Sequence, residues 1–501
     1  MKRILMTADW VVGHQDGAHC MYRNGVVVVE GDKVLHVGYQ FDGDVAETVE
    51  FGAALIGPGF VDLDALGDLD TTVLGYDNQP PERKGRVWPQ SYIDAGPREM
   101  YSPDELAFQK RYAFSRLIRN GITTALPIAS LFYRAWGETY EEFAQAAQAA
   151  EELGLRVYLG PAYRTGNLVV DDVSGDISFH YDEEKGLAGL AQAERFAEQF
   201  EGRAKGLIRT MLAPDRIETC TPELLLRTGE LGRALDIPVR LHCCQSRMEY
   251  DKVLAQHGKS PLELLRDVHF FNDKTVLPHG LFLSGLNGIA YDAPDTSILV
   301  NSGAALAHCP LVMARGGRIM KSFRKFRDLG VGIGLGTDTH PPDMIANMAL
   351  GVMTARIAEE NPGAATAADL YSAATVGGAD ALGRSDLGRL QPGSAADLNV
   401  IRLDDPAMGQ LIDPIQTILL NGCGRDVSDV MIAGVFVMRN REINGVDNAS
   451  AQKKAQAQFE GMMAKYPERT LGHPDTSEIF SSSFPAGPVR QNLVEEGRRR
   501  T

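Results

Sequence analysis

The sequence predicts an α/β protein, a (β/α)8 TIM-like barrel with a small composite β-sandwich formed by both termini. Three observations support this fold. The middle of the chain alternates between short apolar runs and helical patterns, both ends are rich in strand-like runs, and 501 residues exceed one ordinary domain. We therefore expect a sandwich from residues 1–57 and 386–445, a barrel over 58–385, and a C-terminal helix and tail over 446–501.

Both ends of the chain are rich in short strand-like runs. Residues 1–57 hold short β-like runs such as GVVVVEGDKVLHVG, separated by Gly, Asp and Asn turn residues. Residues 393–445 contain further runs of the same kind, ADLNVIRL and DVMIAGVFVMRNREING. Strand-rich ends around a different middle predict one β-domain assembled from both termini.

The middle of the chain supplies the strands and helices of the barrel. Residues 58–64 form the first predicted strand, and seven apolar runs follow it, at 121–129, 156–163, 204–212, 237–244, 274–284, 303–310 and 331–338. Helical patterns separate them, among them 102–120, 139–154 and 221–235. SPDE and TPEL open two of these patterns with a capping residue, a Pro and an acid in the first turn. Alternation of this kind predicts a closed parallel barrel.

Two segments lie outside the regular pattern. Residues 67–103 are rich in Gly, Pro, Asp and Arg, and we expect a long loop on the catalytic face of the barrel. Composition alone does not separate a mobile lid from a static loop. The segment after about residue 446 begins as a helix, SAQKKAQAQFEGMMAKY, and ends polar.

Charge and composition narrow the class of partner. A net charge of −16 and a pI near 5.2 argue against nucleic acid or an anionic membrane. The N-terminus lacks the apolar region of a signal peptide, and no run of 18 apolar residues occurs. Six cysteines without a CxxC pair indicate reduced thiols. We expect a cytoplasmic homo-oligomer that acts on a small molecule.

Polar residues end four of the predicted strands. His242, His279 and His308 close three successive apolar runs, and Asp338 closes the last. Catalytic groups of a barrel lie at the carboxyl ends of its strands, so these side chains are predicted to meet. Imidazole nitrogens with a carboxylate suit Zn²⁺, Fe²⁺, Co²⁺ or Mn²⁺. The sequence therefore predicts a site for one divalent metal ion, with zinc as the expected ion.

These motifs together resemble the amidohydrolase superfamily, in particular the subgroup of triazine chlorohydrolases and nucleobase-type deaminases. The resemblance covers residues 1 to about 445 and rests on PGFVD at 58–62, GITT, HGLFLS at 279–284, AHCP at 307–310, GLGTD at 334–338 and GRLQPGSAADLNV at 388–400. It implies a barrel with a composite sandwich, and a metal-activated water that hydrolyses C–N or C–Cl bonds.

The resemblance also implies roles for individual residues. His242 matches a metal ligand, and Asp338 matches a ligand that also accepts a proton. His279 matches a ligand or a group that orients the water, and His308 matches a substrate contact.

The chain departs from the family pattern at two important places. The subgroup carries His-x-His in its first strand, where this chain has Asp64 and Leu66. Strand alternation directs both toward the site. Leu66 cannot bind a metal, whereas Asp64 either ligates it through oxygen or hydrogen-bonds within the barrel floor. The family's His-x-x-Glu becomes His242 followed by Gln245, an amide that hydrogen-bonds but cannot shuttle a proton.

Two further positions concern the substrate. Arg164, in GPAYRTG at the end of the third strand, is predicted to contact substrate or to form a surface ion pair. HCPLVMARGG at 308–317 replaces the usual His-Cys-Pro-x-Ser-Asn of the subgroup and its polar contact.

The sequence therefore predicts a mononuclear metal-dependent hydrolase with Asp338 and His279 as catalytic residues. His242, His279, Asp338 and Asp64 are the candidate ligands, and His308, Gln245 and Arg164 the candidate substrate contacts. Without an acid at position 245, we favour a C–N bond of an amide, urea or carbamate as the target. The alternatives are a ring deaminase or dechlorinase of triazine- or pyrimidine-like compounds, and a non-catalytic protein on the same fold.

Overall fold

The centre of the molecule is a parallel β-barrel. The structure, a computed structural model, describes residues 2–69, 87–96, 98–128, 134–485 and 487. Eight parallel strands follow one another in chain order: β6 (Phe60–Leu66), β8 (Ile122–Ile128), β9 (Arg156–Leu159), β13 (Ile208–Thr210), β15 (Val239–Arg240), β16 (Thr275–Pro278), β17 (Ala305–His308) and β18 (Gly332–Leu335).

Contacts at both edges close this sheet. β18 pairs with β6 through Leu335 and Asp62. Parallel bridges join Leu212 to Val239 and Arg216 to His242, linking β13 and the chain after it to β15 and the chain after it. The predicted (β/α)8 barrel is therefore confirmed.

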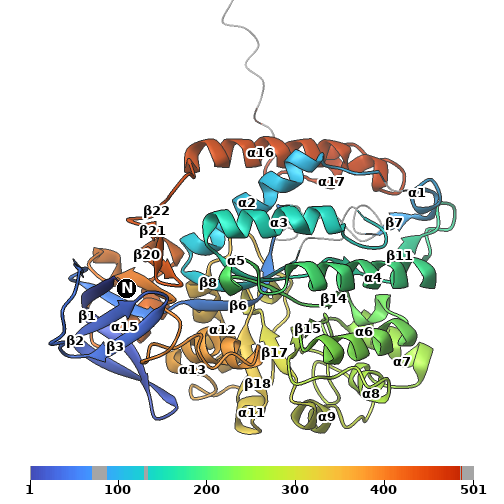
Figure 1. The fold of residues 1–501 in the computed structure, drawn as a ribbon. Coiled ribbons are helices and arrows are strands. Elements are labelled where there is room, and N and C mark those ends of the chain that lie inside the picture. The colour runs from blue at the N-terminus through green and yellow to red at the C-terminus, as the bar shows by residue number, and fades with distance from the viewer. Residues whose placement is uncertain (1, 70–86, 97, 129–133, 486, 488–501) are drawn as a thin grey trace, which may run out of the picture.

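Helices surround the barrel (Figure 1). They are α2 (Pro103–Arg119), α3 (Tyr140–Leu153), α4 (Glu183–Phe200), α6 (Pro222–Leu235), α7 (Arg247–His257), α8 (Pro261–Asp267), α9 (Asp295–Ser302), α10 (Pro310–Arg315), α11 (Phe323–Asp328), α12 (Met344–Ala358), α13 (Ala367–Ser372) and α14 (Gly378–Ala381). α2 begins as predicted, because the Ser102 hydroxyl accepts the Glu105 N–H and the Glu105 carboxylate accepts the Ser102 N–H.

Local detail differs from the predicted ranges at two places. The strand predicted over 204–212 starts only at Ile208, because α5 (Arg203–Gly206) precedes it as a tight turn with positive φ at Ala204 and Lys205. The long segment 67–103 contains the short strand β7 (Trp88–Pro89) and helix α1 (Gln90–Asp94). Residues 70–86 of this segment, for which a lid was one of the two expectations, lie outside the described residues.

Short strands extend the open end of the barrel. β7 pairs with β11 (Gly166–Val170), which forms a hairpin with β12 (Ile177–Tyr181). β10 (Ala162–Tyr163) pairs with β14 (Ala213–Pro214). β7 follows β6 along the chain, β10, β11 and β12 follow β9, and β14 follows β13, so these strands lie at the end of the barrel where its strands finish.

Both ends of the chain build one further sheet. Its strands are β1 (Arg3–Gln15), β2 (Ala18–Glu30), β3 (Lys33–Gly38), β4 (Glu47–Glu50), β5 (Ala54–Pro58), β19 (Leu398–Arg402), β20 (Val427–Ile432), β21 (Val435–Arg439) and β22 (Glu442–Ile443). β5 lies between β1 and β19, so the two termini meet inside the sheet. The helix α15 (Pro414–Asn421) lies beside it (Figure 1). The composite domain is confirmed.

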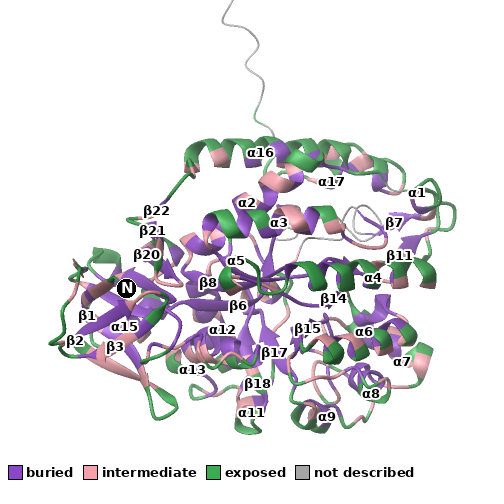
Figure 2. Cartoon of the chain, viewed as in Figure 1, coloured by how far each residue is buried: buried purple, intermediate pink, exposed green. Residues whose placement is uncertain are grey.

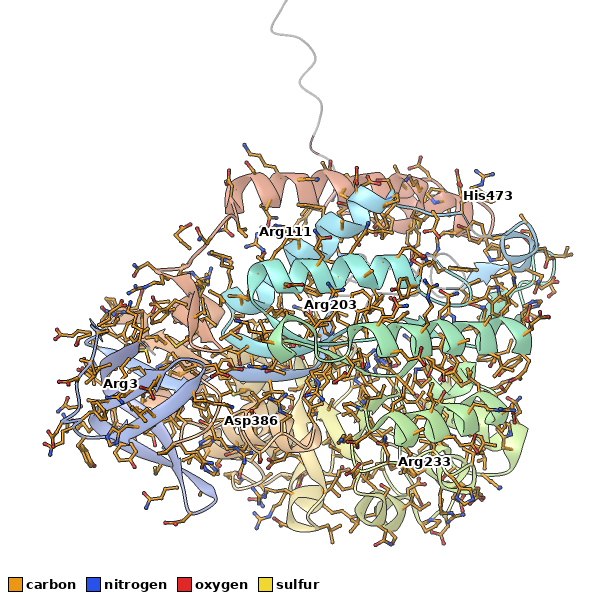
Figure 3. The ribbon with its side chains drawn as sticks, viewed as in Figure 1. Arg3, Arg111, Arg203, Arg233, Asp386 and His473 are labelled. Carbon is orange, nitrogen blue, oxygen red and sulfur yellow. The ribbon has the colours of Figure 1, made fainter. Side chains whose placement is uncertain are left out.

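Polar contacts attach this sheet to the barrel, and the first of them is buried. The Arg156 guanidinium of β9 forms two hydrogen bonds, of 3.0 and 3.1 Å, to the Asp397 carboxylate. Asp386, labelled in Figure 3, accepts from Arg384 at 2.8 Å and lies 3.7 Å from the Lys33 ammonium of β3. Figure 2 shows the barrel strands and the inner strands of the sheet as buried.

The C-terminal segment covers the outside of the barrel. The helix α16 (Asn448–Lys465) lies across α2 (Figure 1), and α17 (Thr476–Ile479) follows it. The Gln458 amide donates to the Glu105 carbonyl oxygen at 3.1 Å, and the Tyr112 hydroxyl donates to Gln452 at 2.5 Å. Within the described residues, no helix combines the length and the apolar character that crossing a bilayer requires.

Candidate active site

Three of the predicted residues meet at the carboxyl end of the barrel. Asp64 of β6, His242 after β15 and His279 after β16 each offer one ligand atom, and these atoms lie within 4.8 Å of one another. All three side chains are buried. Asp64 is therefore a member of the cluster, although its carboxylate also accepts a hydrogen bond from within the barrel.

Asp338 adjoins this cluster. Its Oδ2 lies 3.7 Å from His279 Nε2, and its N–H donates to the Asp64 carbonyl oxygen at 2.7 Å. Its side chain is 16% exposed, whereas those of Asp64 and His279 are fully buried. Asp338 thus lies on the accessible side of the cluster, where a substrate can reach it.

The histidines suit a divalent cation. His242 Nδ1 lies 2.9 Å from the Asp215 carbonyl oxygen, which only accepts, so Nδ1 carries a proton and Nε2 is the atom that the neutral ring would offer to a cation. Nε2 lies 3.7 Å from Asp64 Oδ2. Neither ring nitrogen of His279 has a hydrogen-bond partner in the described part of the chain. Buried polar atoms rarely lack partners, and a cation held by nitrogen and oxygen would satisfy both rings.

A buried arginine supports the Asp64 carboxylate. Arg240 Nη1 donates to Asp64 Oδ1 at 3.2 Å and to the Leu126 carbonyl oxygen at 3.3 Å. This contact fixes one oxygen and leaves Oδ2 facing His242. Ligating carboxylates are commonly oriented by such outer hydrogen bonds. Our sequence reasoning missed Arg240, although a charged residue two positions before His242 in an apolar strand points to the same face.

Neighbouring charges shift the pKa values of these groups. Burial would raise the pKa of Asp64, but the charges of His242 and Arg240 outweigh it and lower that pKa to about 2. Burial lowers the pKa of His279 well below its usual value, and the charge of His242 adds to this. Burial and the Asp64 charge raise the pKa of Asp338 to about 8. The site thus combines a carboxylate, a neutral imidazole and a carboxyl group that exchanges protons near neutral pH.

The loops that follow the strands hold unusual backbone conformations. Cys244, His279 and Asp338 have positive φ values of 60, 78 and 40°. Each such residue other than Gly costs roughly 1–3 kcal/mol and persists where the surrounding structure requires it. The three lie just after β15, β16 and β18, where the turns direct side chains into the site.

The first barrel strand departs from strict alternation. The register between β6 and β8 shifts between Asp62 and Ala65, within the stretch that carries Asp64. The Asp62 carboxylate accepts from the Thr337 N–H at 2.9 Å and its hydroxyl at 2.5 Å. Asp62 therefore clamps β6 to the chain after β18, while Asp64 turns toward His242.

Close approach of these two strands requires a glycine. A Cβ placed on Gly336 would lie 2.5 Å from the Asp64 Cβ and 2.9 Å from Cys309 Sγ. Any side chain at this position would displace Asp64. The glycine of GLGTD thus has a steric role at the site.

Gln245 follows His242 by three residues along the chain, and its side chain is uncommitted. Its N–H donates to Glu249 at 2.8 Å, and its carbonyl oxygen accepts from Arg318 at 3.3 Å. Its side-chain amide makes no hydrogen bond within the described parts of the chain. Glu249 also accepts the Cys244 N–H, so it fixes the turn after β15. The amide of Gln245 remains available to a ligand.

The other predicted substrate contacts have different surroundings. Arg164 donates to Asp215 at 2.9 Å and to the carbonyl oxygens of Ala135 and Arg134, each at 2.9 Å. His308 ends β17, is buried, and has no partner for Nδ1 among the described residues. Burial lowers its pKa to about 4, so its ring is neutral.

Asp68 and Asp70 follow β6 directly along the chain. Asp68 is buried, and its charge helps to raise the pKa of Lys110, although burial alone would lower that pKa. Asp70 lies outside the described residues. Asp68 is not part of the donor cluster of Asp64, His242 and His279.

Known proteins share sequence with most of this chain. The sequence model of the Amidohydrolase family matches residues 75–437. A 5-methylthioadenosine/S-adenosylhomocysteine deaminase of Natronomonas pharaonis is 27% identical over 432 residues, which cover 85% of this chain and 91% of that protein. A 5'-deoxyadenosine deaminase of Methanococcoides burtonii is 25% identical, over 84% of this chain and 89% of that protein.

Solved structures share the fold. An adenosine deaminase of Xanthomonas campestris with bound zinc superposes with a TM-score of 0.72 at 20% identity, covering 92% of this chain and 98% of that one. An atrazine chlorohydrolase of Arthrobacter aurescens complexed with zinc gives a TM-score of 0.74 at 20% identity, covering 91% and 100%.

Proposed function

The chain belongs to the amidohydrolase family, an enzyme class that hydrolyses carbon–nitrogen bonds other than peptide bonds, and we propose that it deaminates small nitrogen heterocycles. The donor cluster of Asp64, His242 and His279 carries this proposal. Its relatives include proteins named as deaminases of adenosine-type nucleosides, which supports an amino-substituted ring as the substrate.

We assign one divalent cation, with zinc first, to the cluster. His242 and His279 would hold it through nitrogen, and Asp64 and Asp338 through oxygen. A bound divalent cation would acidify a water molecule and polarise the bond that is attacked. Zinc in two structures of the same fold supports this choice of ion.

The residues around the cation divide the remaining work. Asp338 lies on the accessible side of the cluster and accepts the proton of the attacking water, then returns it to the departing amine. His279 lies 3.7 Å from Asp338 and would orient the attacking water beside that carboxyl group. The uncommitted amide of Gln245 donates a hydrogen bond to the ring, and the neutral His308 lies at the end of the adjacent strand.

One observation favours a second candidate function. Gln245 cannot protonate a ring nitrogen, and protonation assists attack on an aromatic ring. Amides, ureas and carbamates need only proton delivery to the leaving amine, which Asp338 can perform. A hydrolase of these compounds is therefore the alternative.

Metal analysis and ammonia release test both candidates. The purified protein is expected to hold one zinc per chain by elemental analysis, and the zinc-loaded protein to release ammonia from aminopurines, aminopyrimidines or aminotriazines. Matched panels of ureas and carbamates serve as the comparison. Hydrolysis of the second panel alone would replace the proposal with the alternative, and loss of zinc without loss of activity would refute both.

A further inference from the structure

Arginine side chains gather at the end of the barrel where the candidate metal centre lies. Arg216 forms a parallel bridge with His242, so the two residues lie side by side at the same level of the sheet. Bridge partners of parallel strands direct their side chains to the same face. Arg216 therefore points toward the end of the site that His242 occupies, and its side chain is exposed there.

The guanidinium of Arg216 is not neutralised by contact. It makes no hydrogen bond or ion pair with any residue that the structure describes. A guanidinium is not deprotonated in proteins, so Arg216 keeps its charge, and the carboxylates of Asp215, Glu218 and Asp338 act on it from beyond ion-pair distance.

Two further arginines come from the loop after β17. The exposed Arg315 ends α10 and donates to the hydroxyl of Thr339, the residue after Asp338. Arg318 donates to the Gln245 carbonyl oxygen at 3.3 Å. These contacts join the turns that follow β15, β17 and β18, so Arg315 and Arg318 share the open end of the barrel with Arg216.

Two other arginines of the site each form an ion pair with a carboxylate. Arg164 pairs with Asp215 at 2.9 Å and Arg240 pairs with Asp64 at 3.2 Å. Arg216 and Arg315 have no carboxylate within ion-pair distance in the described ranges. A guanidinium without an ion-pair partner at the opening of the site carries a charge that no direct contact neutralises. It would attract and hold an anionic ligand group.

We propose that Arg216, assisted by Arg315 and Arg318, binds a carboxylate group of the substrate and so selects acidic heterocycles. The proposal rests on the proposed function for the ring, but the anion site is defined by the arginines alone. A guanidinium matches a carboxylate with two parallel hydrogen bonds. Glu218 and Asp215 lie beside Arg216 and would repel a phosphate dianion more strongly than a carboxylate.

Matched ligand pairs test this assignment. Aminopyrimidine and aminotriazine carboxylic acids are compared with their carboxamides, which have the same shape without the charge. Binding to the zinc-loaded protein is measured by isothermal titration calorimetry. We expect the acids to bind about 10- to 100-fold more tightly, the range expected when a charge-assisted hydrogen bond is gained.

Variants separate Arg216 from general electrostatics. Arg216→Met is expected to abolish the preference for the acid. Arg216→Lys is expected to keep part of it, because the Lys ammonium keeps the charge but cannot donate two parallel hydrogen bonds to a carboxylate. Arg227→Met is the matched control, since Arg227 is exposed on α6 and pairs with Glu223. It should leave the preference unchanged. Circular dichroism confirms that each variant is folded.

Several results would overturn the proposal. Equal affinity for acids and carboxamides would do so, as would absence of binding by every acid, or the same small effect of Arg216→Met and Arg227→Met. Tighter binding of the matching phosphonates would exclude carboxylate as the preferred group. Because binding is measured without turnover, failure to hydrolyse any heterocycle would refute the proposed function and leave the comparison of acid and amide valid.

Discussion

Arg156 of the barrel and Asp397 of the terminal sheet form a bidentate ion pair in which both side chains are at least nine-tenths buried. Asp397 Oδ1 also accepts the Ala433 N–H at 2.7 Å. The pair lies where the chain passes between the two domains, since the Asp397 carbonyl oxygen accepts the Gly59 N–H at 3.0 Å. One buried pair thus connects both termini to the barrel.

Removing the cation of this pair should destabilise the protein strongly. Arg156→Met leaves Asp397 charged and buried without its partner, and such a loss costs about 3–5 kcal/mol. The measurement is the midpoint of urea unfolding. Arg227→Met, at the exposed pair with Glu223, should cost less than about 0.5 kcal/mol. Similar midpoints for the two variants would show that the buried pair does not join the domains energetically.

A buried glutamate should make stability depend on pH. Burial and the neighbouring Glu142 raise the pKa of Glu138 to about 8, well above its usual value. The folded chain therefore keeps this proton between pH 4.5 and 8 while the unfolded chain has lost it, so stability falls as pH rises through that window.

Glu138→Gln should remove this dependence. Its amide oxygen still accepts the Ala162 N–H, which Glu138 accepts at 2.7 Å. The variant should match the parent below pH 5 and exceed it by about 1–3 kcal/mol at pH 9. Unfolding midpoints at both pH values give the measurement, and the exposed Glu141→Gln is the control. A parallel pH profile for parent and Glu138→Gln would contradict the assignment.

Metal retention should depend on the donor cluster. His242→Ala and Asp64→Ala each remove one of three clustered ligand atoms and should lower zinc content after dialysis from one ion per chain to near zero. His308→Ala is the control, because His308 lies outside that cluster. Full zinc content in Asp64→Ala would show that Asp64 only orients its neighbours.

The barrel and most of this site could be predicted because they leave signals within short stretches of the sequence. Apolar periodicity marks each strand, and His242, His279 and Asp338 stand where those strands end. The role of Asp64 could not be decided, because it depends on a register shift in β6 and on Arg240, 176 residues away in the chain. Contacts of that kind arise from the closure of the barrel and leave no periodic signal.

The proton path should separate Asp338 from Gln245. Asp338→Asn removes a positioned acid–base group, which typically costs about 10²–10⁴-fold in rate. Gln245→Ala removes one neutral hydrogen bond, about 1 kcal/mol or several-fold, and should appear mainly in KM. Steady-state kinetics on the best substrate give both values. Comparable kcat losses in the two variants would assign the proton transfer to neither residue alone.

A single substitution should show why this chain differs from the family pattern. Gln245→Glu places a carboxyl group where the amide makes no hydrogen bond to the described residues. A carboxylic acid there can protonate a ring nitrogen, which the amide cannot. Deamination of triazine- or pyrimidine-like rings should therefore rise by about 10- to 100-fold, within the range of general acid catalysis.

The control for this variant is hydrolysis of ureas and carbamates, in which no ring needs a proton. That activity should stay within a few-fold of the parent, so the ratio of the two activities isolates the new acid. An equal change in both would mean that Gln245→Glu alters the metal site instead. Efficient ring deamination by the parent with no gain in Gln245→Glu would mean that another residue delivers the proton. Asp338 is then the first candidate, because it lies on the accessible side of the cluster and its pKa is raised to about 8 by burial and Asp64.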